Sequence, residues 1–290
     1  MLRKIFAFLS IARVQKPVGT TLLFLPCLWG VFLGAQKVKD FLWLFLFYAG
    51  AFLMRSAGCI LNDFFDKDFD KHIARTKNRP LVTKELTSFE ALSFFAVLCL
   101  LALVVFVNLS PVAQIFSLYG FFIMLFYPLL KRVTYFPQVG LGLAFNCGVF
   151  VAYACLKPNL TFLMVLKDML PFYIGGVFWT LSYDTLYAFQ DFEEDKKIGV
   201  KSLTYYFSSY DEKRVLDWLF LVSFIGYLSG GKLLHLSHFY ELGLCLVIAC
   251  HFFLRAKLNM QDASTYKAYF SNQQWIGILV GVALLLGKLL

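Results

Sequence analysis

Two short acidic clusters have the residue types and spacing that best suit chemistry. The first runs from Asn62 to Asp70 and the second from Asp191 to Asp195, and each follows a long apolar segment. Asp66 and Asp70 are four residues apart, as are Asp191 and Asp195. On a helix, residues at this spacing share a face, with Cβ atoms about 5–6 Å apart. Such a pair suits Mg²⁺, which takes one or two carboxylates and fills its other positions with water and substrate phosphates.

The repetition of the aspartate pair is stronger evidence for a metal site than either pair alone. A single pair of this kind is usually the solvated end of a helix, but here both pairs are followed by basic residues. Two facing pairs predict a clamp for a diphosphate, which becomes a good leaving group once cations neutralise its charge. If the diphosphate sits on an allylic carbon, its departure leaves an allyl cation. A cavity inside a membrane excludes water and suits such an ion.

The composition places these clusters in a membrane protein. Apolar residues make up 60% of the 290 residues, and the mean hydropathy is +0.70. We therefore expect an all-α, polytopic membrane protein forming one domain over residues 1–290. The first sixteen residues predict an amphipathic cytoplasmic helix. Apolar runs long enough to span a bilayer lie at 17–36, 41–61, 88–109, 112–130, 137–156, 169–190, 215–231, 239–254 and 274–290.

The basic residues predict the orientation. Of the 27 Lys and Arg, 20 lie at the amino terminus or after the second, fourth, sixth and eighth apolar runs, and five lie in the alternate loops. The positive-inside rule then puts the amino terminus and both acidic clusters in the cytoplasm, in a protein of the cell inner membrane. A net charge of +9 distributed in this way argues against a nucleic-acid partner.

The motifs resemble those of a known family. Asn62-Asp63-x-x-Asp66-x-x-x-Asp70 and the later stretch from Tyr183 to Ser202 closely resemble the two signatures of the UbiA superfamily of intramembrane aromatic prenyltransferases. The resemblance is greatest to the 4-hydroxybenzoate polyprenyltransferase branch. Further stretches that resemble this branch are 54–59, 75–81 and 127–138. One departure is Phe192, where relatives usually have an arginine that could contact phosphate.

The resemblance implies a fold and an activity. We expect about nine transmembrane helices in one bundle, around a central cavity that cytoplasmic loops cap. The implied reaction is the Mg-dependent transfer of a polyprenyl group from polyprenyl diphosphate to the ring of 4-hydroxybenzoate, an aromatic hydroxy acid, in ubiquinone-type quinone biosynthesis. Membrane lipid surrounds the bundle. Two alternatives stay open, namely a hydroxynaphthoate acceptor in menaquinone biosynthesis and a non-enzymatic transporter.

The resemblance also implies roles for individual residues. The residues expected to hold Mg²⁺ are Asn62, Asp63, Asp66, Asp70, Asp191 and Asp195, and the catalytic residues are Asp66, Asp70, Asp191 and Asp195. The residues expected to bind substrate are Arg55, Asn62, Arg75, Arg79, Tyr127, Lys131, Arg132, Asp184, Tyr187 and Lys201.

Arg55 is the principal charged residue expected away from the cytoplasmic ends of the helices. It lies seven positions before Asn62, about two helical turns along the same face, and so should point into the cavity. A buried arginine needs an anion, and the carboxylate of the acceptor is a natural partner. The alternative is a structural ion pair with an aspartate such as Asp184.

Overall fold

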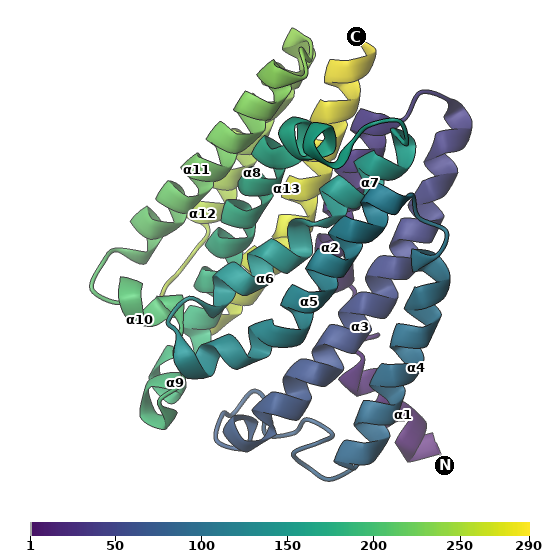
Figure 1. Cartoon of the computed structure of the whole chain (residues 1–290). Coiled ribbons are helices and arrows are strands. Elements are labelled where there is room, and N and C mark those ends of the chain that lie inside the picture. Colours follow the sequence, from purple (N-terminus) through teal and green to yellow (C-terminus); the bar gives the residue numbers. More distant parts are fainter. Residues whose placement is uncertain (1) are drawn as a thin grey trace.

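The structure, a computed structural model, describes residues 2–290, apart from the side chain of Ala263. Helices make up most of the described chain, in which no strand occurs (Figure 1). The elements are α1 (Leu2–Ile11), α2 (Val18–Gly34), η1 (Val38–Leu42), α3 (Trp43–Asp70), α4 (Ser88–Phe106), α5 (Pro111–Val133), α6 (Pro137–Asn146), α7 (Gly148–Leu156), α8 (Phe162–Ala188), η2 (Phe189–Asp191), α9 (Phe192–Ile198), α10 (Leu203–Phe207), α11 (Glu212–Leu233), α12 (His238–Ala256) and α13 (Ala263–Leu289).

Every predicted apolar run folds as helix. Within the described residues, seven helical segments are long and apolar enough to cross a membrane, and the pair α6 and α7 counts as one of them. The apolar helix α2 is shorter, with 17 residues. α11 is not among these seven segments, and its first turns contain charged residues such as Glu212 and Asp217. The all-α fold is therefore confirmed, whereas the count of nine spans stays a prediction.

The long helices form one bundle (Figure 1). α8 packs on α11, α13 on α12, and α2 lies between α7 and α13. On the other side, α4 packs against α3. The α2–α7 contact is close because Gly30 has no side chain, and a Cβ atom there would lie 2.6 Å from the backbone oxygen of Val149. The core is aromatic at its centre, where the rings of Trp29 and Trp179 lie 5.6 Å apart.

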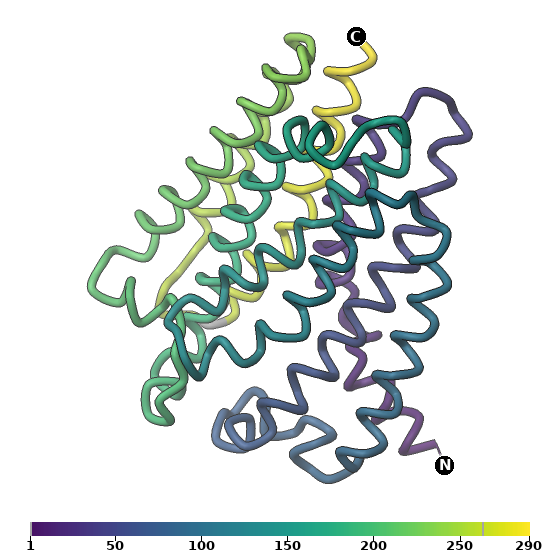
Figure 2. The backbone as a smooth tube through the Cα atoms, in the orientation of Figure 1, coloured from purple at the N-terminus to yellow at the C-terminus, as the bar shows by residue number. Residues whose placement is uncertain are grey.

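Both acidic clusters lie at one end of the bundle, which we call the acidic end. The backbone trace shows that α1, the loop of residues 71–87, α9 and α10 gather there (Figure 2). The first cluster is helical because α3 continues to Asp70, beyond the predicted apolar run. Thr87 and Glu90 then form a capping box that starts α4, so the loop between α3 and α4 has a fixed end.

Candidate active site

The first acidic cluster lies on the last turns of α3. Asn62, Asp66 and Asp70 are spaced four residues apart, so they follow one face of the helix. The Nδ2 atom of Asn62 donates a hydrogen bond to Oδ2 of Asp66 at 2.8 Å. Asp66 and Asp70 are both buried, with 4% of their surface exposed. Carboxylates so buried require cationic partners.

The second cluster differs from the continuous helix that its spacing suggested. α8 ends at Ala188, a single 3₁₀ turn follows, and Asp191 is the N-cap residue of α9. Asp195 lies in the first turn of α9, which also carries other acidic residues. Carboxylates in a first turn are favoured by the partial positive charge of a helix N-terminus. Gly199, with φ of 73°, ends this short helix in the left-handed conformation.

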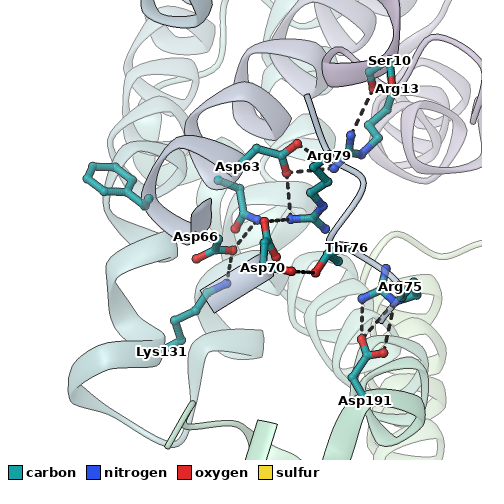
Figure 3. Close-up of polar contacts among 12 residues, drawn as sticks. Ser10, Arg13, Asp63, Asp66, Asp70, Arg75, Thr76, Arg79, Lys131 and Asp191 are labelled. Atoms are coloured by element: carbon teal, nitrogen blue, oxygen red, sulfur yellow. Dashed lines mark hydrogen bonds and ion pairs between the residues drawn. The ribbon is translucent and has the colours of Figure 1, made fainter. Parts of the chain in front are cut away.

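Basic residues from other segments bind three of these carboxylates (Figure 3). Lys131, near the end of α5, forms an ion pair with Asp66. Arg79, from the 71–87 loop, binds Asp70.

Arg75, from the same loop, binds Asp191 with two nitrogens, and its Nε lies 3.0 Å from Oδ2. Burial disfavours the charged guanidinium of Arg75, but the hydrogen bonds and the charge of Asp191 outweigh it, so the pKa of Arg75 is raised.

These residues surround one polar cavity of about 680 Å³ at the acidic end. Most of the predicted site residues line it. They are Arg55, Asn62, Asp63, Asp66, Asp70, Arg75, Arg79, Tyr127, Lys131, Asp184, Tyr187, Asp191, Asp195 and Lys201. The structure thus brings residues from α3, α5, α8, α9 and two loops to one cavity, and the roles assigned to them stay a prediction.

Arg132 is the one predicted site residue that does not line this cavity. Its Nη2 donates to the backbone oxygen of Phe65 at 2.6 Å, and its guanidinium lies over the ring of Phe69. Phe192, the departure from the family motif, is also turned away, because its ring packs against that of Tyr205. Phe192 therefore contributes no side chain to the lining of the polar cavity.

A second cavity, of about 310 Å³, is almost entirely apolar. Side chains of α2 to α7 line it, including Phe47 of α3 and Ala102 of α4. Arg55, Tyr127 and Leu141 line both cavities, so they mark the boundary between a polar chamber and an apolar one. The site can therefore take a ligand with a charged head and a long apolar tail.

Arg55 is half-buried at this boundary, and none of the ion pairs of the described residues includes it. Its Nε atom has no hydrogen bond, and in the part of the chain that the structure describes no ion pair joins Arg55 to Asp184. The guanidinium lies 5.6 Å from the ring centre of Phe145. It fits beside α2 because of Gly19, where a Cβ atom would lie 2.6 Å from the Nε of Arg55. The alternative of a structural pair with Asp184 is therefore not seen in the described residues, and the guanidinium of Arg55 can bind an anion.

The cavity also contains basic residues that were not among the predicted site residues. Arg13 and Lys16, just after α1, and Lys267 of α13 all line it. Burial and the nearby positive charges, Arg13 first among them, lower the pKa of Lys16. The closeness of basic residues to both acidic motifs could not be read from spacing, because α1 and α13 are remote from the motifs in the chain.

No metal site is preformed among residues 2–290. No three histidine, cysteine or acidic side chains there converge closely enough to hold a metal ion. The donor set nevertheless suits Mg²⁺, which is commonly bound through one or two carboxylates together with substrate phosphates. Asp66 gives a further indication that a cation can bind here, because its buried Oδ1 has no hydrogen-bond partner. An unpaired buried carboxylate oxygen of this kind can accept a cation.

A helical membrane bundle with a cation-rich polar cavity beside an apolar one has the architecture that an intramembrane prenyltransferase needs. The model of the UbiA prenyltransferase family matches residues 23–285, and the chain belongs to this family. It is therefore a multi-pass membrane protein.

Curated relatives are similar along nearly the whole chain. A "4-hydroxybenzoate octaprenyltransferase" from Tolumonas auensis is 36% identical over 283 residues, covering 96% of this chain and 95% of the relative. One of the same name from Psychromonas ingrahamii is 36% identical, covering 98% and 96%. A mitochondrial "4-hydroxybenzoate polyprenyltransferase" from Rattus norvegicus is 39% identical over 78% of this chain and 60% of the relative.

Solved structures share the fold. An apo UbiA homolog from Aeropyrum pernix K1 superposes with a TM-score of 0.78 at 21% identity, covering 93% of this chain and 98% of that one. A UbiA homolog from Archaeoglobus fulgidus, bound to GPP and Mg²⁺, gives a TM-score of 0.70 at 18% identity, covering 96% and 99%. The fold prediction from the sequence motifs is confirmed by these likenesses.

Proposed function

We propose that this chain transfers a polyprenyl group from polyprenyl diphosphate to the ring of 4-hydroxybenzoate and releases diphosphate. The observation that carries the proposal is the meeting of both acidic motifs at one polar cavity that continues into an apolar one. The names of the curated relatives support the acceptor, and the Archaeoglobus structure with GPP and Mg²⁺ supports the donor class and the metal.

The acidic end binds the diphosphate. Mg²⁺, when bound, neutralises the diphosphate and makes it a good leaving group. The residues that hold the metal and the diphosphate are Asn62, Asp66, Asp70, Asp191 and Asp195, and those that contact phosphate oxygens are Arg75, Arg79, Lys131 and Lys201. To do so, Lys131 and Arg75 exchange their present carboxylate partners for phosphate. Mg²⁺ would then replace these basic side chains as the cationic partner of the carboxylates.

The apolar chamber binds the prenyl tail. Its walls expose almost no polar surface, so they exclude water from the carbon that the diphosphate leaves. Tyr127 stands at the boundary of the two chambers, where an aromatic face can stabilise a cationic carbon. The C–O bond of the donor breaks there, a C–C bond forms to the ring of the acceptor, and the ring loses a proton.

The acceptor lies between Arg55 and α8. Arg55 binds its carboxylate, since a half-buried guanidinium whose Nε has no partner is well suited to a bidentate carboxylate contact. Asp184 and Tyr187 flank the ring on the α8 side of the polar cavity. Arg132 takes part indirectly, through its hydrogen bond to the backbone of α3 at Phe65.

We also propose that the chain lies in the cell inner membrane, with the amino terminus and the acidic end facing the cytoplasm. The excess of basic residues at that end supports this orientation. It gives the polar cavity access to a water-soluble aromatic acid and to Mg²⁺.

The test is a reaction with purified protein in lipid vesicles. The protein receives a polyprenyl diphosphate, Mg²⁺ and either 4-hydroxybenzoate or a hydroxynaphthoate, and the products are identified by mass. We expect prenylated 4-hydroxybenzoate and no product when Mg²⁺ is chelated. A prenylated naphthoate alone would reassign the acceptor, and no prenylated product with any acid would refute the proposal.

A further inference from the structure

Asp63 is held differently from the other acidic residues of its motif. Its side chain is only 2% exposed. Nη2 of Arg13 donates to its Oδ1 at 2.8 Å and to its Oδ2 at 2.9 Å. Nη1 of Arg79 lies 2.9 Å from Oδ1. Two arginines, from opposite ends of the first ninety residues, thus converge on this carboxylate (Figure 3).

These contacts leave little room for a metal ion on Asp63. A carboxylate has about four lone-pair sites over its two oxygens. Oδ1 already receives both arginines, and Oδ2 receives Arg13. A divalent cation bound there would also lie beside two guanidinium groups, and repulsion between like charges is strong where water is excluded.

The contacts continue from Asp63 to the end of α3. Arg79 binds Asp70 as well as Asp63, and Oγ1 of Thr76 donates to the backbone oxygen of Asp70 at 3.0 Å. Arg13, Asp63, Arg79 and Asp70 therefore form a row of alternating charge. This row connects the segment after α1 and the 71–87 loop to α3.

Arg13 shows how firmly the row is held. Its φ of 56° lies in the left-handed region, which residues other than glycine rarely occupy. Such a conformation persists only where the surroundings hold it. Here the guanidinium is held by Asp63 and by the backbone oxygen of Ser10, to which Nη1 donates at 3.1 Å.

We infer that Asp63 is a positioning residue that holds Arg13 and Arg79 at the polar cavity for contact with the diphosphate, and that it does not ligate Mg²⁺. Both arginines line that cavity. Each guanidinium carries five N–H donors, so donors remain for phosphate oxygens. This inference rests on the proposed diphosphate site and gives Asp63 a role there other than that of a metal ligand.

Asp63→Asn tests the inference, because it keeps the volume of the side chain and removes its charge. Asp68→Asn is the matched control, since Asp68 is on the same helix and its side chain is 75% exposed. Calorimetry measures the affinity for pyrophosphate at saturating Mg²⁺. The same binding signal, followed as Mg²⁺ is varied, gives the half-saturating Mg²⁺ concentration. We expect Asp63→Asn to weaken pyrophosphate about tenfold, as loss of charge-assisted contacts does, and to leave the Mg²⁺ requirement unchanged.

The opposite pattern would overturn the inference. If Asp63→Asn raised the half-saturating Mg²⁺ concentration tenfold and excess Mg²⁺ restored pyrophosphate affinity, Asp63 would be a ligand. If Asp63→Asn does not fold, Arg13→Gln tests the same inference. It should weaken pyrophosphate to a similar degree, and unchanged affinity would overturn the inference.

A wild-type protein that binds no pyrophosphate would also overturn the inference. By contrast, if wild-type protein and all variants bind pyrophosphate as expected above but no prenyl transfer occurs, only the proposed function would be refuted.

Discussion

Arg75 and Asp191 join the two acidic motifs across the polar cavity. Arg75 follows the first motif by five residues, and its Nε lies 3.0 Å from Oδ2 of the aspartate that begins the second. Next to this pair, the backbone nitrogen of Ala74 donates to Glu194 at 3.1 Å. The 71–87 loop therefore rests on α9, so that a ligand between the motifs contacts both at once.

Removing the charge of Asp191 should impair catalysis. We expect Asp191→Asn to lower kcat by on the order of 10² or more, because the protein would lose a ligand for the Mg²⁺ that neutralises the departing diphosphate. Glu193→Gln is the control, since Glu193 is exposed in the same first turn of α9. The turnover rate of each variant is measured with the purified protein in lipid vesicles. A folded Asp191→Asn protein with near-normal turnover would contradict the two-motif clamp.

Arg55 should determine the affinity for the aromatic acid. Lysine offers a point charge where arginine offers a planar pair of donors, so Arg55→Lys should raise the KM for 4-hydroxybenzoate about tenfold. The KM for the prenyl donor should change much less. Steady-state kinetics, with each substrate varied in turn, measure the KM for the acid and the KM for the donor separately. If the donor KM rose and the acid KM did not, Arg55 would belong to the diphosphate site.

Gly19 offers an independent test of the same contact. A methyl group at Gly19 would lie 2.6 Å from the Nε of Arg55 and must displace it. Gly19→Ala should therefore reproduce the acid-specific KM effect without altering Arg55 itself. An unchanged acid KM in a folded Gly19→Ala protein would show that the position of the Arg55 guanidinium does not matter.

The apolar chamber should limit the length of the prenyl tail. Ala102→Phe places a large ring in the wall of a cavity of about 310 Å³. We expect a higher KM for long polyprenyl diphosphates and little change for geranyl diphosphate. Leu101→Phe is the control, because Leu101 is exposed and does not line the chamber. Equal effects on short and long donors would place the tail elsewhere.

The orientation can be tested with cysteines at the two ends of the bundle. Lys77→Cys and Lys197→Cys lie on exposed positions at the acidic end, and Asn159→Cys lies in the loop between α7 and α8 at the other end. In intact cells, a membrane-impermeant reagent should label only the cysteine at 159. Permeabilisation should expose the other two. Labelling of 77 and 197 from outside would reverse the proposed topology.

The sequence by itself determined the class of fold. Apolar runs such as 88–109 predict helices, because a chain in lipid must satisfy its backbone hydrogen bonds within each segment. The repeated aspartate spacing in the two motifs predicted a site for a cation and a diphosphate. Both signals depend on residues that are close together in the chain, so they can be read from a single sequence. They also matched the family that the comparisons show.

Only the tertiary structure decided how the charges are paired. Arg13 and Arg79 meet at Asp63, and Lys131 reaches Asp66. Neighbours along the motif look equivalent in the sequence, yet Asp63 is held by arginines while one oxygen of Asp66 has no partner. The difference arises because the surroundings of each carboxylate are set by the packing of α1, α5 and the 71–87 loop, and ionic contacts between segments so far apart leave no periodic trace in the chain.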